Sequence, residues 1–150
     1  GSPIILLREK SESEKEHRRV LPIWIGFPEA AAISWEFNDE KPSRPMTHDL
    51  MLSIIEELGA TVKSIVIHSI KDATFYGKVL LEMNGEEIEI DSRPSDSIAL
   101  ALRAKAPILI DNEVIESSGF PEEKLKDIEK QSTKKILENL DEDTLEKLKV

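Results

Sequence analysis

The dipeptide Asn84-Gly85 constrains the fold of this chain more than any other feature of the sequence. Both residue types accept the positive φ angles of a two-residue hairpin turn, and the segments on either side are rich in strand-forming residues. We therefore predict that Thr74–Met83 and Glu86–Asp91 pair as an antiparallel hairpin. Another β-rich run, Thr61–Ile70, precedes the hairpin and is separated from it only by Lys71-Asp72-Ala73. The sequence thus predicts a meander of antiparallel strands.

Two well-delimited helices are predicted beside this meander. Thr47 offers the hydroxyl of an N-cap, apolar residues then recur at helical spacing, and Gly59 stops the helix. Ser95 is expected to cap a second helix over Asp96–Lys105. Shorter elements complete the pattern, namely strands at Ile4–Leu7, Val20–Ile25 and Pro107–Ile110 and an Ala-rich helix from Pro28 to Trp35. Together they predict an α+β fold with a mixed, largely antiparallel sheet and helices packed against it.

One domain, residues 1–119, is predicted to be followed by a helical tail, residues 120–150. A chain of 150 residues is long enough for one sizeable core and short for two. Apolar residues are sparse among the many charges of the tail, so its helices need a partner surface. Truncation after Gly119 is therefore expected to leave the melting temperature of the rest nearly unchanged.

The charge balance limits the partners that the chain can bind tightly. Its formal net charge is −10, whereas binding to a phosphate backbone is driven mainly by Lys and Arg. Nucleic acid is therefore expected as a substrate rather than as a tight ligand. No apolar stretch approaches the roughly 20 residues of a membrane-spanning helix, so no membrane partner is expected. The lack of cysteine fits a reducing compartment, and we expect a cytoplasmic location.

Two segments with the same order of residue types lead into the two long helices. One is Arg44-Pro45-Met46-Thr47-His48-Asp49, and the other is Arg93-Pro94-Ser95-Asp96. An arginine beside the positive end of a helix dipole is unfavourable for stability but suits the capture of a phosphate or carboxylate. The candidate phosphate-binding residues are therefore Arg44, Arg93, Thr47 and Ser95. The alternative is that the arginines only form ion pairs with Asp49, Asp91 or Asp96.

Four separated runs of the sequence closely resemble the bifunctional nuclease domain family. They are Val20-Leu-Pro-Ile-Trp-Ile-Gly26, Arg44-Pro-Met-Thr-His-Asp-Leu50, Ile67-His-Ser-Ile-Lys-Asp-Ala-Thr-Phe-Tyr76 and Asp91-Ser-Arg-Pro-Ser-Asp-Ser-Ile-Ala-Leu-Ala101. The resemblance covers roughly residues 2–119 in matching order. It implies nuclease activity on DNA and RNA and an α+β fold that self-associates as a homodimer or another homo-oligomer. Many relatives continue into a UVR motif, a helical hairpin tied to partner binding, and the tail is similar to the approach to one.

Phosphodiester hydrolysis needs a polarised phosphate and an activated water, and the residues at the helix starts offer groups for both. We expect His48, Asp49 and Asp96 to be catalytic, with His48 as a proton carrier. Asp49, Asp91 and Asp96 offer hard oxygen ligands that suit Mg²⁺ or Mn²⁺. The first hypothesis is therefore a nuclease of low sequence specificity that is assisted by a divalent metal. The structural alternative makes the aspartates helix caps and His48 an exposed residue at a helix start.

The second hypothesis is a non-catalytic, self-associating interaction domain that recruits a protein partner through the tail. The acidic charge and the lack of an orthodox catalytic motif favour this alternative. A half-exposed meander leaves apolar surface and a sheet edge, which predicts a closed homo-oligomer, most simply a dimer. Glu29 has a structural explanation in the helix dipole. Core or oligomer contacts are expected for the aromatic residues Trp24, Trp35, Phe75 and Tyr76, because no basic residues are interleaved with them.

Overall fold

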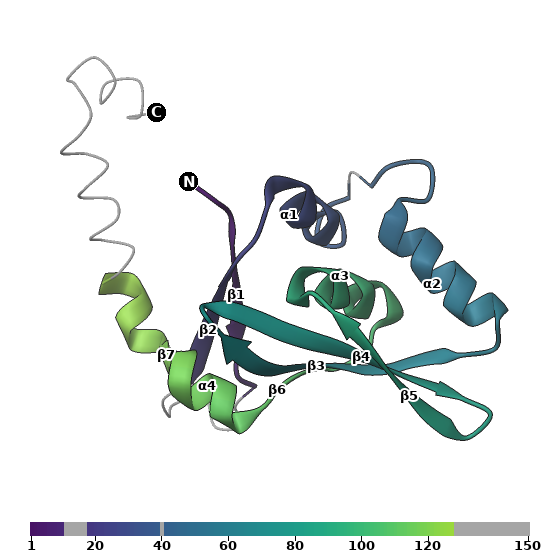
Figure 1. The fold of residues 1–150 in the computed structure, drawn as a ribbon. Coiled ribbons are helices and arrows are strands. Elements are labelled where there is room, and N and C mark those ends of the chain that lie inside the picture. Colours follow the sequence, from purple (N-terminus) through teal and green to yellow (C-terminus); the bar gives the residue numbers. More distant parts are fainter. Residues whose placement is uncertain (11–17, 40, 128–150) are drawn as a thin grey trace, which may run out of the picture.

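Two sheets and a group of helices make up the fold (Figure 1). The computed structural model describes residues 1–10, 18–39 and 41–127. The smaller sheet is antiparallel, with the order β1-β2-β7, and consists of β1 (Ile4–Arg8), β2 (Arg19–Trp24) and β7 (Phe120–Pro121). The larger sheet has the order β5-β4-β3-β6 and consists of β3 (Thr61–Lys71), β4 (Thr74–Met83), β5 (Glu86–Ser92) and β6 (Ile108–Ile110).

Strands β3, β4 and β5 form the predicted antiparallel meander. Its second turn has positive φ angles at Asn84 and Gly85, 53° and 77°, as a two-residue hairpin turn requires. Its first turn places Asp72 and Ala73 at φ angles of 50° and 61°, a region that few non-glycine residues adopt. Strand β6 runs parallel to β3, so the larger sheet is mixed. The predicted α+β class with a largely antiparallel sheet is confirmed.

Helix α3 (Pro94–Ala104) packs on β3 and β4 and contacts both α1 (Phe27–Ser34) and α2 (Thr47–Glu57) (Figure 1). Its buried face carries small and aliphatic side chains, which lets the helix approach the sheet closely. Since α3 contacts both of the other helices, the first turns of all three can exchange side-chain contacts.

The predicted caps of the two long helices are wrong. Met46 is the N-cap of α2 and Arg93 is the N-cap of α3, so Thr47 and Ser95 lie inside the first turns. Thr47 is exposed, whereas Ser95 is buried. At α2 the Asp49 carboxylate acts as a cap, because it accepts a hydrogen bond from the N–H of Met46 at 2.9 Å. At α3 proline occupies the first helical position, where its missing N–H leaves no intrahelical bond unmade.

Both sheets contribute to one hydrophobic core. Helix α4 (Asn112–Ser118) contacts β2 of the smaller sheet and β3 of the larger one, and so joins the two. Gly119 ends α4 and lies so close to the helix that a Cβ at this position would overlap the carbonyl oxygen of Ile115. The core consists mainly of aliphatic side chains, including Leu21, Ile23, Ile65, Ile67, Val79, Leu81, Ile98, Leu100, Val114 and Ile115.

The smaller sheet continues past residue 119, where the sequence placed the end of the domain. Phe120 and Pro121 form β7 and pair with β2, and the short 3₁₀ helix Glu122–Lys124 follows. Glu122 donates its N–H to the carbonyl of Arg18 at 2.8 Å and forms an ion pair with Arg8 at 2.8 Å. Residues 128–150, which include most of the predicted helical tail and the approach to a UVR motif, lie outside the described residues. In the part that is described, no helix has the length and apolar character needed to cross a membrane.

Candidate functional site

The first turn of α1 contributes Glu29 to the candidate site. Gly26 is the N-cap of α1, and a Cβ at this glycine would overlap the carboxylate of Glu29. The glycine therefore lets the glutamate fold back over the beginning of its own helix. One carboxylate oxygen, Oε1, accepts a hydrogen bond from Nη1 of Arg93 at 3.1 Å. Glu29 thus belongs to a contact between helices, which the helix dipole alone did not predict.

The first turns of the other two helices extend this contact into a chain. Arg93 donates from Nε to Oδ2 of Asp96 at 2.9 Å. The other oxygen of Asp96, Oδ1, lies 3.0 Å from Nε2 of His48 in the first turn of α2. His48 is buried, so the interpretation of it as an exposed residue at a helix start is wrong. The Glu29–Arg93–Asp96–His48 chain joins the beginnings of α1, α3 and α2.

Electrostatics favour the ionised forms of Asp96 and Arg93 within this group. Burial acts to raise the pKa of Asp96, but hydrogen bonds from Arg93 and His48 outweigh it, so the pKa lies below its ordinary value. The hydrogen bond with Asp96, together with the bond to Glu29, raises the pKa of Arg93. The ion-pair alternative is therefore correct for Arg93 in its contact with Asp96. Nevertheless, 65% of the Arg93 side chain remains exposed, so the guanidinium also stays open to solvent.

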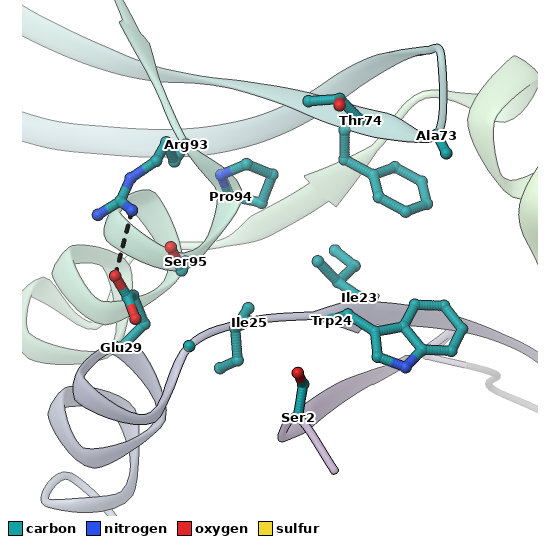
Figure 2. A pocket seen from close by; sticks show the side chains of 12 residues that line it. Ser2, Ile23, Trp24, Ile25, Glu29, Ala73, Thr74, Arg93, Pro94 and Ser95 are labelled. Carbon is teal, nitrogen blue, oxygen red and sulfur yellow. Dashed lines mark hydrogen bonds and ion pairs between the residues drawn. The ribbon is translucent and has the colours of Figure 1, made fainter.

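A cavity of about 540 Å³ lies beside Arg93 and Glu29 (Figure 2). Segments far apart in the sequence surround it, namely the end of β2 with the start of α1, the turn between β3 and β4, and the start of α3. Figure 2 shows Arg93 and Glu29 at one end, with Trp24 and Ala73 at the other. Phe75 also lines this cavity. The cavity therefore has one charged end, and aromatic side chains line it elsewhere.

Arg44 lies at a different place from Arg93. It lines a separate hollow of about 310 Å³ with Trp35, Lys41, Asp49 and Arg103, and the two hollows share no lining residue. Arg44 forms no ion pair with another described residue, so the ion-pair interpretation does not hold for it there. The two candidate phosphate-binding arginines therefore do not line one common pocket. Arg93 alone lines the larger cavity.

Arg103 is a structural residue of this region that was not predicted from the sequence. Only 4% of its side chain is exposed, and its Nε donates to Oδ1 of Asp49 at 2.7 Å. It also donates to the carbonyl oxygens of Ala99, at 2.8 Å, and Ala32, at 3.0 Å, so that one guanidinium connects α1, α2 and α3. A signal was present in the sequence, because Arg103 follows the buried Ala99 by four residues and therefore lies on the same face of α3.

The three aspartates expected to bind a metal do not come together. Asp49 is held by Arg103 and by the N–H of Met46, and these bonds outweigh its burial and lower its pKa. Asp96 is held by Arg93 and His48, while Asp91 is exposed on β5. Within residues 1–10, 18–39 and 41–127, no group of three or more His, Asp or Glu side chains is placed to hold a metal ion. The residues present therefore do not fit the expected Mg²⁺ or Mn²⁺ site.

Comparisons with known proteins agree with the resemblance in the sequence. The family model described as the bifunctional nuclease domain matches residues 5–123. An uncharacterized protein of Mycobacterium tuberculosis is 40% identical over 120 residues, which cover 80% of this chain and 68% of that protein. Bifunctional nuclease 2 of Oryza sativa subsp. japonica is 28% identical over 121 residues, 79% of this chain and 36% of the relative. Bifunctional nuclease of Oryza minuta is 28% identical over 80 residues, 51% of this chain and 24% of the relative. The chain belongs to the bifunctional nuclease domain family.

Proposed function

We propose that this chain is a nuclease that hydrolyses phosphodiester bonds of DNA and RNA with low sequence specificity in the cavity beside Arg93. The observation that carries the proposal is the convergence of three of the four family-like runs on this one cavity. Trp24 and Gly26, Ala73 to Phe75, and Arg93 to Ser95 all line it. Family membership and the names of the rice relatives support the same activity.

Arg93 is the group that we assign to the phosphate. A guanidinium has five N–H donors, and the described contacts of Arg93 use Nε and Nη1. Donors therefore remain for two phosphate oxygens, where they would stabilise the charge that develops as water attacks phosphorus. Asp96 orients the guanidinium, and the contact with Nε2 of His48 fixes the position of Asp96. Because neither Asp96 nor His48 lines the cavity, both are positioning residues in this proposal, and His48 is not the proton carrier.

Glu29 is the group that we assign to the water. It lines the cavity beside Arg93, and 22% of its side chain is exposed. In the proposed reaction the oxygen of a water forms a bond to phosphorus while its proton passes to the Glu29 carboxylate. The bond from phosphorus to the leaving oxygen breaks, and that oxygen takes a proton from solvent. The proposed reaction uses neither Mg²⁺ nor Mn²⁺, because the three aspartates expected to bind the ion lie apart.

Two features explain why nucleic acid would be a transient substrate. Glu29 and Asp96 flank Arg93, so the formal charge of the group is −1 when His48 is neutral, and the whole chain carries −10. A phosphate must approach the free donors of the guanidinium against the negative charge of both carboxylates, and no excess of positive charge attracts the backbone. We therefore propose that nucleic acid binds weakly and is turned over, and that it is not a tight ligand.

The proposal is tested with matched arginine variants. Arg93→Gln removes the charge-stabilising group and Glu29→Gln removes the general base, so each should lower kcat/KM on DNA and RNA by about 100-fold. Arg8→Gln is the control, because Arg8 forms a similar exposed ion pair with Glu122 away from the cavity. Activity must elute with the protein in gel filtration and is measured with and without EDTA. Undiminished cleavage by Arg93→Gln would contradict the proposed site, and loss of wild-type cleavage in EDTA would contradict the metal-free route.

A second candidate function is a non-catalytic, self-associating interaction domain. The observation that favours it is an exposed apolar stripe on α2, formed by Leu50, Ile54 and Leu58, each at least half exposed. These residues are four apart and so lie on one face of the helix, beside the face that covers the core. Large apolar patches of this kind often mark protein interfaces. This function predicts stable self-association with no cleavage in any preparation. The protein partner expected at the tail would bind residues that lie outside those described.

A further inference from the structure

The aromatic side chains of the cavity have no part in the chemistry proposed above. Trp24 ends β2, is 63% exposed and lines the cavity together with the half-buried Phe75. An exposed tryptophan at the rim of a cavity is costly to leave in water, because its large apolar surface stays hydrated. Of the two roles predicted from the sequence for Trp24, a core contact or an oligomer contact, the first is therefore wrong. Its surface is available to a ligand.

The two ends of the cavity match the two parts of a nucleotide. Arg93 at one end can hold a phosphate, and Trp24 at the other end can hold a flat, apolar ring (Figure 2). The volume of about 540 Å³ lies within the range typical of pockets that enclose a small ligand. The turn that carries Ala73 closes this end in a left-handed backbone conformation, which the surrounding structure must hold in place.

We propose that Trp24 is a stacking platform for one unpaired base, so that the substrate must present a single-stranded or unstacked nucleotide to the cavity. This inference rests on the proposed function, since it places the phosphate next to that base on Arg93. In a duplex both faces of a base are covered by its neighbours, so Trp24 can reach a base only where the strand is unpaired. Stacking does not depend on the identity of the base, which agrees with low sequence specificity.

Binding of short strands tests the platform separately from cleavage. The probes are an oligothymidylate of about ten nucleotides, an abasic strand of equal length and charge, and a duplex. Trp24→Ala should weaken binding of the oligothymidylate by about 5- to 150-fold, the range that stacking of one base supplies, and Trp24→Phe by less. The abasic strand and the duplex should bind wild type and variants with the same low affinity. Phe37→Ala is the matched control, because Phe37 is also exposed but does not line this cavity.

A direct signal comes from tryptophan fluorescence. The chain has two tryptophans, so Trp35→Phe leaves Trp24 as the only reporter. The oligothymidylate should quench this emission and the abasic strand should not, with both strands checked afterwards by gel electrophoresis. Unchanged affinity of Trp24→Ala, or equal binding of abasic and thymidylate strands, would overturn the inference. A change of oligomeric mass in Trp24→Ala with unchanged affinity would overturn it too, since Trp24 would then be a contact between copies.

Failure of this inference can be told apart from failure of the nuclease proposal. Base-dependent binding without cleavage by any preparation would support the platform and contradict the nuclease. Cleavage by Trp24→Ala at the wild-type rate on single strands would support the nuclease and contradict the platform. Selective loss of single-strand cleavage in Trp24→Ala, with Phe37→Ala unchanged, would support both.

Discussion

Arg103 holds the helices that carry the candidate site. Its guanidinium is almost fully buried and bonds to Asp49 on α2, to Ala99 on α3 and to Ala32 on α1. Removing it leaves two carbonyl oxygens without this donor and leaves Asp49 with only the N–H of Met46. Its role is therefore structural, although it lies in the same layer of helices as Arg93.

Arg103→Leu should lower the free energy of unfolding by about 1.5–3 kcal/mol, the usual contribution of hydrogen bonds made by a charged group. The side chain of Asp49 is partly exposed, so water compensates some of the loss and a larger effect is not expected. Urea unfolding measures the change. Arg8→Gln, which breaks an exposed ion pair, should stay within about 1 kcal/mol of wild type. Equal stability of the two variants would contradict the buried role of Arg103.

Asp96 makes the stability of the fold depend on pH. Its pKa in the folded chain is lowered, because hydrogen bonds from Arg93 and His48 outweigh the effect of burial. A lowered pKa means that the carboxylate stabilises the fold above its unfolded pKa of about 4, and that this contribution is lost as the pH falls through the folded pKa. Wild type should therefore exceed Asp96→Asn in stability at pH 6.

The pH series that tests this uses urea unfolding of both proteins from about pH 6 down to the acid limit of folding. The difference between wild type and Asp96→Asn should shrink steadily below about pH 4. Asp91→Asn is the control, since Asp91 is exposed and forms no described ion pair. A difference that stays constant over the whole series, or grows in acid, would show that the Asp96 charge does not stabilise the fold.

Helix α2 carries more apolar side chains than those that pack against the core. Met51, Leu52 and Ile55 pack against the core, while Leu50, Ile54 and Leu58 point to solvent. Ile90 on the edge strand β5 is exposed as well, so the predicted half-exposed meander leaves apolar surface uncovered. We propose that the α2 stripe is where copies of the chain meet as a homodimer, which is compatible with either candidate function.

Ile54→Lys should convert this dimer to a monomer with little loss of thermal stability per chain, because half of Ile54 is already exposed and it is not among the residues of the core. Light scattering over a micromolar concentration series measures the mass. Ser53→Lys adds the same charge to the same helix outside the stripe and should leave the mass unchanged. A wild-type chain that remains a monomer at every concentration would contradict self-association altogether.

Strand β7 changes the effect on the melting temperature that we expect from truncation after Gly119. Ending the chain after Gly119 removes the pairing of Phe120 with Val20 and the contacts of Glu122 with Arg8 and Arg18. A chain that ends after Gly119 should therefore melt several degrees below one that ends after Asp127, given about 1–2 kcal/mol for the half-buried phenylalanine and its neighbours. Calorimetry of the two truncated chains decides this. Equal melting temperatures would show that β7 adds nothing to the stability and would support the predicted boundary after residue 119.

Over the whole molecule, the positions of most helices and strands could be predicted from neighbouring residues, whereas contacts between distant residues could not. The turn at Asn84-Gly85 is a local preference, and the alternation of the flanking strands sets their pairing. The caps of α2 and α3 were misplaced because the hydroxyls of Thr47 and Ser95 were taken as the signal, whereas Asp49 and Pro94 decide where the helices begin. Identifying the two helix starts correctly therefore did not identify the groups that cap them.

The candidate site depends on contacts between residues far apart along the chain. His48 and Asp96 are 48 positions apart, Asp49 and Arg103 are 54 apart, and Glu29 and Arg93 are 64 apart. No local pattern encodes such pairs, so the sequence pointed to Arg93 and Asp96 but grouped them with Arg44 and Asp91. The fold separates Arg44 into its own hollow and brings in Glu29 and Trp24.

The central claim is that nucleic acid binds in the cavity between Arg93 and Trp24. The most direct test follows the backbone amide resonances of the isotope-labelled chain by NMR while the oligothymidylate is added. We predict shifts that concentrate at residues 24–29, 73–75 and 93–96 and that disappear in Arg93→Gln. Shifts that concentrate around Arg44 and Lys41, or that appear nowhere at saturating strand, would contradict it.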